Sequence, residues 1–401
     1  MADTADSKSA GAKPREGSSP SFPTTHSMDR RKFLQLAAAS AAAAHAQGPR
    51  GKAPEYNIVS AYEQQQSGFP GQFPAKVVCV SSDRSVGADS AVDQAAVREM
   101  LDRGMLSLTG AKDSKAAWAT FFQRGDVIGV KLNCSGAPAI QSSPEIAGEV
   151  VKSLMDLGIP GPQIYLYDRF ADQIESIGYG KFVPEGVKII GIEKVRDSLE
   201  GYDPKTYVEV NFFGEENTRS MLVSLVAKTF TKIINLPVMK EHGAAGVTGC
   251  LKNIAYGNFS NVARSHQGAL THTYSFIGTL AGVEPLRSKT VLNIMDGLNG
   301  IWHGGPFSIL PEYRFSPKQI MLGTDPVAMD RLLIDVIEAK RKQENAVSLW
   351  DRGKEHIQPG TDVTKPNFNH FVREPGHIEM AGNMGLGEYD KAKIKKIDLS
   401  V

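Results

Sequence analysis

The sequence lacks a strong charge of either sign and contains few cysteines. Its 401 residues carry a formal net charge of +1, which argues against a nucleic-acid binder because such a protein needs a basic face. The three cysteines form no CxxC pair, which excludes a four-cysteine iron–sulfur motif within this chain. Neither an HExxH metal motif nor a GxxxxGK[ST] phosphate loop occurs. A Walker-type nucleotide site is therefore excluded, and any metal site must be assembled across loops.

The first part of the chain has the features of an export signal. A stretch rich in Ser, Ala, Gly and Pro precedes Met28, which is an alternative start, and is expected to be disordered. The pair Arg30-Arg31 is followed by an alanine-rich apolar run and an Ala-x-Ala pattern that ends at Ala46. This order is typical of a signal peptide, and the paired arginines resemble a twin-arginine leader. We expect the twin-arginine machinery to export the protein to the periplasm, with cleavage near Ala46 and no membrane span in the mature chain.

The chain is expected to have three parts. Residues 1–46 form a disordered extension plus the leader, residues 47–75 a linker rich in Pro, Gly and Gln, and residues 76–401 a single α/β domain. In that domain, short apolar runs alternate with longer amphipathic segments, which predicts a largely parallel sheet flanked by helices. The predicted strands are 76–80, 127–132, 164–167, 187–191, 232–236, 291–295 and 319–322, and the helices 91–103, 144–157, 274–281 and 326–340.

Residues 232–259 contain the densest group of candidate site residues. An apolar run ends at Pro237, and the polar residues Lys240 and His242 follow in what we expect to be a glycine-rich turn. If 248–255 is helical, Thr248 and Lys252 share one face. Strand, turn and helix then form an anion cradle at a helix N-terminus.

Other polar residues follow the ends of other predicted strands. Lys131 and Asn133 follow the second strand, Asp168 the third, and Asp296 the sixth. In open α/β sheets ligands bind outside the carboxyl ends of the strands, so we expect these residues to line one crevice with Lys240. A structural alternative for Asp168 is that it caps a turn, and the alternative for Asn133 is that it is an ordinary turn residue.

Several candidates have structural alternatives. Asp325 before Pro326 is typical of a helix N-cap, and Asp330 is expected to be an ordinary surface charge. Two histidines and an acid could bind a divalent metal, for which His266 and His303 are the candidates, or a histidine could carry protons. No chemistry is expected in the tail that begins at His377. Whether Cys134 and Cys250 form a disulfide stays open, since sequence gives no distance.

These motifs, in this order, resemble a prokaryotic family known as domain of unknown function family 362. The resemblance spans roughly Val77 to Leu399 and is most specific at Asn235, Pro237, Lys240, His242, Thr248, Gly249, Lys252 and Asn253, with further matches at Lys131, Asn133, Asp325, Ala328 and Asp330. Many relatives carry extra ferredoxin-like cysteine motifs, which this chain lacks, so an iron–sulfur cluster is not implied. The resemblance implies one α/β unit and names no reaction.

Two functions remain in contention. The first is an exported enzyme acting on a small anionic substrate, with His242, Lys240 and Asp296 as catalytic residues. Lys131, Asn133, Thr248, Lys252 and Asn253 then bind the ligand, and redox or lyase chemistry with a metal or other cofactor is one version. The alternative is a periplasmic protein that binds an anion or metal without catalysis.

Overall fold

The core of the fold is a large, mostly parallel sheet. The computed structural model describes residues 54–63, 68–266, 272–307, 310–350 and 375–401, all within the unit Ser40–Val401. The strands are β1 (Asn57–Val59), β2 (Lys76–Ser81), β3 (Ile128–Lys131), β4 (Ile164–Phe170), β5 (Lys188–Glu193), β6 (Tyr202–Glu209), β7 (Arg219–Val223), β8 (Lys232–Asn235), β9 (Val238–His242), β10 (Gly246–Thr248), β11 (Thr290–Ile301), β12 (Arg314–Phe315), β13 (Gln319–Gly323) and β14 (Lys395–Ser400). The helices are α2 (Gln94–Thr109), α3 (Ser114–Ala119), α4 (Pro144–Asp156), α5 (Ala171–Ile177), α6 (Ser224–Lys228), α7 (Cys250–Tyr256), α8 (Thr273–Ala281), α9 (Leu286–Lys289), α10 (Pro326–Gln343) and α11 (Gly376–Asn383).

The main sheet has the strand order β14-β2-β13-β11-β8-β3-β4-β5. Along this path β13 runs antiparallel to both of its neighbours, and the other neighbouring strands pair in parallel. The predicted α/β fold with a largely parallel sheet is confirmed. All seven predicted strands and the four predicted helices are present, with ends shifted by a few residues.

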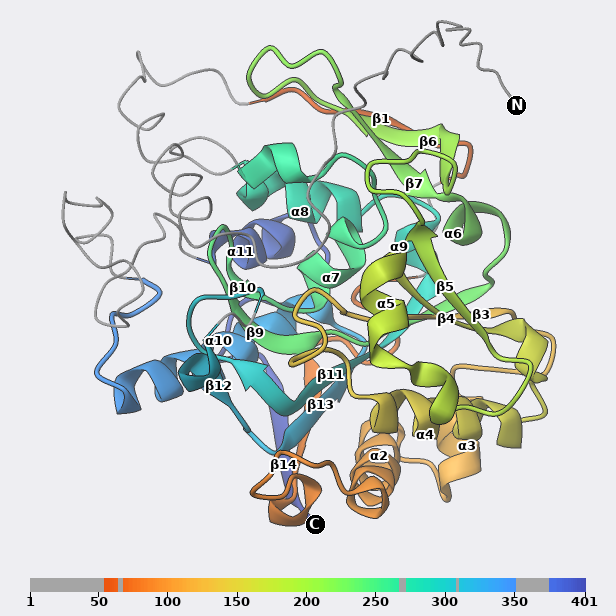
Figure 1. Cartoon of the computed structure of the whole chain (residues 1–401), viewed down its shortest axis with the longest axis vertical. Helices are drawn as coiled ribbons and strands as arrows, with labels where there is room; N and C mark the ends of the chain where they lie inside the picture. The colour runs from red at the N-terminus through yellow and green to blue at the C-terminus, as the bar shows by residue number, and fades with distance from the viewer. Residues whose placement is uncertain (1–53, 64–67, 267–271, 308–309, 351–374) are drawn as a thin grey trace, which may run out of the picture. The chain divides into compact units, whose positions relative to one another are not determined.

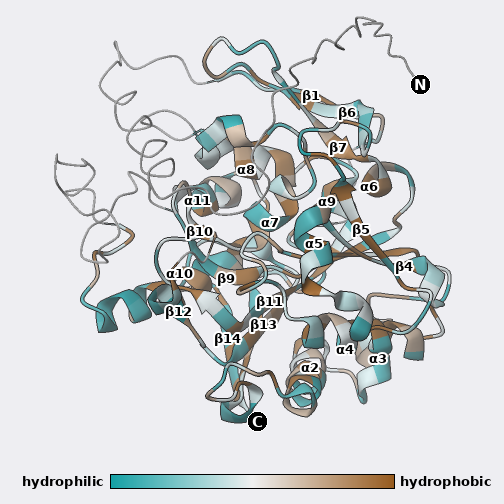
Figure 2. Ribbon diagram, viewed as in Figure 1, coloured by the Kyte–Doolittle hydropathy of each residue, from teal (hydrophilic) through white to brown (hydrophobic). Residues whose placement is uncertain are grey.

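Helices cover both faces of this sheet. On one face α2, α3 and α4 lie over the strands, and on the other lie α7, α8 and α10 (Figure 1). Alternate residues of β2 enter the two cores, Val78 and Val80 one and Val77 and Cys79 the other. This alternation follows from the period of two in a strand and explains why buried strands are apolar throughout. In Figure 2 the central strands β11 and β13 are largely brown, whereas the C-terminal end of α10 is teal.

The structure contains strands that the sequence did not predict. A separate three-stranded sheet has the order β1-β6-β7, and β1 lies in the segment expected to be a linker. The strand β6 contains Pro204 between two charged residues, a pattern that argues against a strand. The expected polar turn after Pro237 is wrong, because residues 238–242 and 246–248 form the antiparallel hairpin β9–β10. Its polar side chains are buried, so apolar periodicity did not mark it.

Two observations bear on export and on the cysteines. Among the described residues, none of the helices combines the length and apolar character needed to cross a bilayer. The export leader expected within residues 1–46 lies outside the described residues. Cys79, Cys134 and Cys250 are all buried free thiols, so Cys134 and Cys250 are not paired in this structure.

Candidate functional site

The polar residues after β3 and β8 lie where the chain reverses its direction across the sheet. From β3 the chain continues to β4 and β5 on one side, whereas from β8 it continues to β11 on the other. Lys131 ends β3 and Asn235 ends β8, and these two residues are paired in register. The carboxyl ends at such a switch point leave a crevice between the diverging connections. The structure therefore places Lys131 at the position in the sheet where α/β proteins commonly bind ligands.

Lys131 is buried in an ion pair. Its Nζ lies 2.5 Å from Asp168 Oδ1 and donates to Leu132 O at 2.6 Å. The second carboxylate oxygen of Asp168 accepts the backbone N–H of Cys134 at 2.7 Å. A buried ammonium with an anionic partner and additional hydrogen bonds is electrostatically balanced. Lys131 and Asp168 therefore form a support of the site.

A chain of asparagines joins four elements of this region. Asn133 Nδ2 donates to Asn253 Oδ1 at 3.0 Å, and Asn253 Nδ2 donates to Asn235 Oδ1 at 2.8 Å. Asn235 Nδ2 in turn donates to Asn293 Oδ1 at 2.9 Å on β11. These contacts fix the loop after β3 against β8, α7 and β11. The predicted ligand residues Asn133 and Asn253 are thus hydrogen bonded to each other.

Lys240 is fully buried without an ion pair among the described residues. Its Nζ donates to Asn133 Oδ1 and, at 3.0 Å, to Ser135 Oγ, both of which are neutral. Burial lowers the pKa of Lys240 to about 8, against the opposing field of Asp168. A substantial fraction of this amine is therefore unprotonated at mildly alkaline pH.

The hairpin β9–β10 presents different residues on its two faces. In its register Thr248 is opposite Lys240, and Gly246 is opposite His242. Because side chains alternate along a strand, Lys240, His242 and Thr248 share one face, and Glu241 lies on the other. Thr248 Oγ1 is buried and makes no hydrogen bond to a described residue. Thr248 does not lie in a helix, contrary to the prediction, yet it faces the same side as Lys240.

His242 is held as a neutral imidazole. Its Nδ1 accepts the backbone N–H of Ala244 at 2.9 Å, so the proton of the neutral ring is on Nε2. Burial, followed by the charges of Lys252 and His266, keeps the pKa of His242 well below 6.5. The ring centroid of His266 lies 5.5 Å away. At neutral pH His242 is a hydrogen-bond donor without charge.

Lys252 on α7 has no hydrogen bond or ion pair in the described part of the chain. Its ammonium lies 4.6 Å from the ring centroid of Tyr256, and its side chain is partly exposed. Burial, followed by the charges of Lys240, Arg169 and Lys131, lowers the pKa of Lys252 to about 7. The residue is thus reachable from solvent while its charged neighbours are all cationic.

His377 on α11 joins this cluster from the far end of the chain. Its ring is fully buried, and neither ring nitrogen is hydrogen bonded to a described residue. Burial and then the charge of Lys252 lower its pKa to about 3, although the backbone of Ala245 favours the charged form. Because no chemistry was expected in the tail, His377 was not among the predicted site residues. No local motif marks it, since it follows a proline and a glycine in a short helix.

The name basic cluster is used below for Lys240, Lys252, His242, His377 and Thr248. Lys240, His242 and Thr248 come from the two strands of the hairpin, Lys252 comes from α7, and His377 comes from α11. The charge of Lys252 acts on both histidines, and the charge of Lys240 acts on Lys252 and His242. The hairpin register puts Thr248 opposite Lys240, and these electrostatic interactions indicate that Lys252 and the two histidines are neighbours.

Asp296 lines a different space. Its two carboxylate oxygens accept the N–H of Ser143 at 2.7 Å and of Leu298 at 2.9 Å. Burial raises the pKa of Asp296 to about 7. Asp296 lies in the wall of a cavity of about 590 Å³ together with Ser143 and Glu145, and that wall contains no lysine. Asp296 also pairs with Val238 on β9, and its charge acts on Lys240.

The expected anion cradle at a helix N-terminus is already filled by a side chain. The N–H groups of Cys250 and Leu251 at the start of α7 donate to the Asp330 carboxylate at 2.5 and 2.9 Å. A Cβ at Gly249 would lie 2.0 Å from Asp330 Oδ1, so only glycine fits there. Asp330 is fully buried, which makes its expected surface position wrong, and burial raises its pKa to about 7. Asp325 is an N-cap as predicted, accepting the N–H of Ala328 at 2.9 Å.

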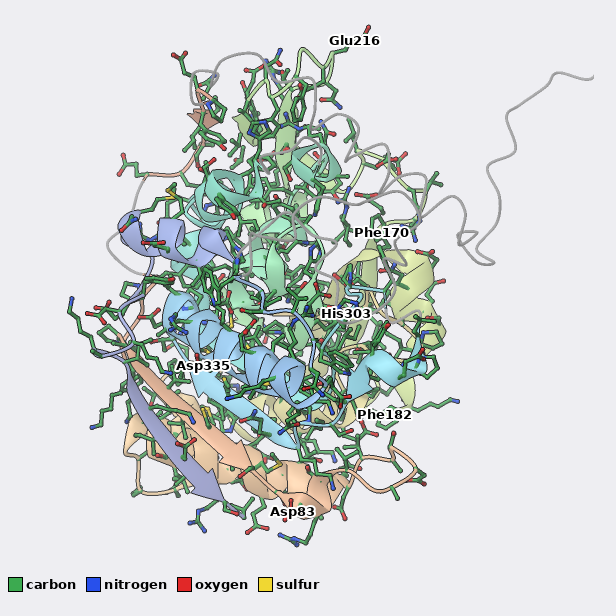
Figure 3. The ribbon with its side chains drawn as sticks, turned by 90° about the vertical axis from the view of Figure 1, so that its left-hand side faces the viewer. Asp83, Phe170, Phe182, Glu216, His303 and Asp335 are labelled. Atoms are coloured by element: carbon green, nitrogen blue, oxygen red, sulfur yellow. The ribbon has the colours of Figure 1, made fainter. Side chains whose placement is uncertain are left out.

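The two histidines predicted as metal ligands have different neighbours. His266 lies beside His242 and Tyr256, whereas His303 Nδ1 lies 3.0 Å from a guanidinium nitrogen of Arg341. The His303 side chain is buried, and Figure 3 labels it. Within the described ranges no group of three or more His, Cys, Asp and Glu side chains could hold a metal ion.

Comparisons with known proteins identify a family and a remote structural likeness. The family model described as Domain of unknown function (DUF362) matches residues 128–335, from the start of β3 into α10. A comparison with curated proteins found no match. Among solved structures, the chain is similar to a protein from Thermotoga maritima, with 11% identity and a TM-score of 0.36. The likeness covers 63% of this chain and 59% of that one, so this chain spans less than two thirds of its length.

Proposed function

Since the chain belongs to the family described as Domain of unknown function (DUF362), whose name states no reaction, we propose a function from the site: an enzyme that binds a small oxyanion and transfers protons to or from it. The substrate carries a carboxylate or phosphate group. The basic cluster binds that group and supplies the acid and the base.

The observation that supports this proposal is the contrast between the lysines of the site. Lys131 has Asp168 at 2.5 Å, whereas Lys240 and Lys252 have no carboxylate partner among the described residues. Burying an ammonium without an anion is costly. An anion from solution would remove that cost and hydrogen bond to Thr248 Oγ1, which has no partner in the described structure. An oxyanion therefore fits the charge and the donors of the cluster.

The roles of the side chains follow from their protonation. Lys240, with its pKa lowered to about 8 by burial, can carry a proton in one step and lack it in the next. His242 stays neutral and offers Nε2–H to a developing negative charge on oxygen. Lys252 and Thr248 hold the oxyanion. Asp296, in the wall of the cavity with Ser143 and Glu145, would act on another group of the substrate.

We place this activity outside the cytoplasm. The twin-arginine pattern at Arg30-Arg31 and the Ala-x-Ala pattern ending at Ala46 support export of the folded protein. Fusing residues 1–46 to a reporter that the twin-arginine route alone exports, and comparing it with an Arg30→Lys/Arg31→Lys leader, tests this proposal. Loss of export in the double variant is expected, and equal export of the two fusions would contradict it.

The activity is tested by a screen for product formation. Purified full-length protein is incubated with a panel of small carboxylates and phosphate esters, and NMR spectra follow any conversion. Conversion of a panel member is expected, with loss of turnover in Lys240→Met and in His242→Ala and retained turnover in Lys228→Met. Lys228 is more than half exposed and pairs with Asp203, so it controls for loss of a lysine elsewhere.

The binding-protein alternative gives a different result in the same experiment. Saturable binding that Lys240→Met abolishes, without conversion of any panel member, would support a binding protein and contradict the enzyme. Circular dichroism of each variant shows whether the fold is retained.

A further inference from the structure

A serine hydroxyl lies within hydrogen-bond reach of the buried amine of Lys240. Ser135 Oγ accepts a hydrogen bond from Lys240 Nζ at 3.0 Å and donates one to Asn133 Oδ1 at 3.1 Å. Because Lys240 Nζ also donates to Asn133 Oδ1, the three groups form a closed triangle of hydrogen bonds. A hydroxyl bonded to an amine that a third residue orients is the arrangement of a base-activated nucleophile. Ser135 and Lys240 are called the dyad below.

The loop that carries Ser135 is anchored on both sides of this residue. The backbone N–H of Cys134, just before it, donates to Asp168 Oδ2 at 2.7 Å. Gly136, just after it, forms an antiparallel bridge with Ile140, and a Cβ on the glycine would lie 2.4 Å from the Ile140 carbonyl oxygen. These anchors fix the Ser135 backbone, so the hydroxyl is held in place before a substrate arrives.

The two members of the dyad differ in exposure. The Lys240 side chain is fully buried, whereas Ser135 is partly exposed, although Asn133 and Cys134 just before it are buried. A molecule from solvent can therefore reach the hydroxyl, while the amine behind it is screened from water. Burial lowers the pKa of Lys240 to about 8, so the neutral amine that accepts a proton is available at mildly alkaline pH.

A second hydroxyl lies beside Lys240 in the hairpin. Thr248 is the cross-strand partner of Lys240, and the Cβ atoms of such partners are about 4.5–5.5 Å apart. Thr248 Oγ1 is buried and makes no hydrogen bond to any residue that the structure describes. A buried hydroxyl without a partner costs free energy, which a hydrogen bond to a ligand oxygen would offset. The register thus brings an available donor next to the dyad.

We propose that Ser135 is a nucleophile that accepts the acyl group of a small ester whose acyl part carries a carboxylate, with Lys240 as its base. This inference rests on the proposed function for the carboxylate, which the basic cluster would bind. It adds a covalent intermediate and specifies the reaction as acyl transfer to water. Thr248 Oγ1 donates to an oxygen of the bound acyl group.

The transfer needs neither an oxidant nor a reductant. Neutral Lys240 Nζ takes the proton of the Ser135 hydroxyl as Oγ forms a bond to the acyl carbon. The bond from that carbon to the leaving alcohol breaks, and the alcohol oxygen takes the proton from the Lys240 ammonium. Water then attacks the acyl carbon and gives a proton to Lys240, and the carbon–Oγ bond breaks as Oγ takes that proton back. The sum is ester plus water, giving acid plus alcohol.

The test is hydrolysis of mono(4-nitrophenyl) glutarate by the full-length protein at pH 8. Release of 4-nitrophenolate measures turnover, and peptide mapping after a rapid acid quench locates any glutaryl group. We expect turnover above the rate in buffer and a glutaryl ester on Ser135 that neutral hydroxylamine removes. Turnover should fall at least about a hundredfold in Ser135→Ala and in Lys240→Met, because each removes one member of the dyad.

Two controls separate this reaction from general reactivity toward an activated ester. Ser176→Ala removes an exposed hydroxyl that donates to Gln173 O at 2.7 Å, and this variant should keep the wild-type turnover. The ester 4-nitrophenyl valerate has an acyl chain of the same length without the carboxylate and should be turned over at least about tenfold more slowly. The peptide map is made on the unaltered chain, so it does not depend on whether the variants fold.

The outcomes distinguish this inference from the proposed function. Equal turnover by the wild type and Ser135→Ala, or a hydroxylamine-resistant adduct on a lysine in place of the Ser135 ester, overturns the serine nucleophile. Binding of glutarate in calorimetry, without turnover or adduct, also overturns it and leaves the proposed function standing. Absence of turnover, of adduct and of binding by any carboxylate or phosphate of the panel overturns both. Equal turnover of the two esters overturns the assignment of a carboxylate to the acyl part.

Discussion

The two faces of the β9–β10 hairpin carry buried polar groups in opposite states. On one face the Glu241 carboxyl group accepts the N–H of Gly305 at 2.7 Å, and burial raises its pKa to about 7 against the field of the buried Arg341. On the other face Lys240 has only neutral partners, and Thr248 Oγ1 has none among the described residues. Matched polar groups hold a fold together, whereas unmatched ones leave binding capacity for a ligand. The comparison teaches that adjacent residues of one strand serve stability and binding separately.

Breaking a matched charge is expected to have the largest effect on stability. Asp168→Ala leaves Lys131 buried without its anion, which should lower the free energy of unfolding by about 3–5 kcal/mol. Chemical denaturation followed by circular dichroism measures this loss. Asp172→Ala is the matched control, because the Asp172–Arg196 pair is exposed on both sides and should contribute less than about 1 kcal/mol. Equal losses in the two variants would contradict the importance of burial.

Removing the carboxylate on the matched face is expected to cost stability and leave binding intact. Glu241→Leu deprives the buried N–H of Gly305 of its acceptor, which should lower the unfolding free energy by about 1–3 kcal/mol. Pyruvate and phosphate affinities should stay at the wild-type values, since Glu241 faces away from the basic cluster. A loss of affinity without a loss of stability would contradict the conclusion that Glu241 serves stability and the opposite face serves binding.

Removing the cation that α7 contributes to the basic cluster is expected to do the opposite. Lys252→Met replaces an ammonium that has no anionic partner in the described structure with an apolar chain of similar length, which removes a desolvation cost. The free energy of unfolding should be unchanged or higher than in the wild type. A fall as large as that of Asp168→Ala would show that Lys252 is a structural residue.

Lys252 should also make the free energy of unfolding depend on pH, with a smaller effect than the substitutions above. The pKa of Lys252 is about 7 in the folded chain and near 10.4 in the unfolded chain, so the unfolded state binds more protons between these values. Wild-type stability should therefore gain a contribution as pH rises from about 7 to about 10.4. Denaturation across this range should show a smaller rise in Lys252→Met. Identical slopes for the two proteins would rule out a lowered pKa.

The sequence predicted the main sheet because its strands are apolar on both faces. Runs such as Ile233-Ile234 and Val77-Val78 are buried between two helical layers. Each strand ends close to the point where its apolar run ends. Lys240 and His242 were expected in a turn because buried polar residues interrupt the apolar signal of β9. In β6, Pro204 concealed the strand.

The sequence predicted the site residues that follow the ends of strands. It did not predict which side chains pair with one another, or a residue that is distant in the sequence. Polar residues after β3 and β8 converge because parallel strands end at one edge of the sheet. Partners could not be assigned, since the same lysine type is paired at 131 and unpaired in the described structure at 252. His377 enters from α11, more than a hundred residues beyond the hairpin, so no spacing in the sequence connects it to His242. The functional roles of these residues stay predictions.

Calorimetric titration with pyruvate tests the central account most directly, when the wild type, Lys252→Met and Glu241→Leu are compared at one pH. The account predicts saturable binding by the wild type, an affinity at least about tenfold weaker in Lys252→Met, and an unchanged affinity in Glu241→Leu. Equal affinities of the wild type and Lys252→Met would contradict it, because Lys252 of the basic cluster would then have no part in holding the anion.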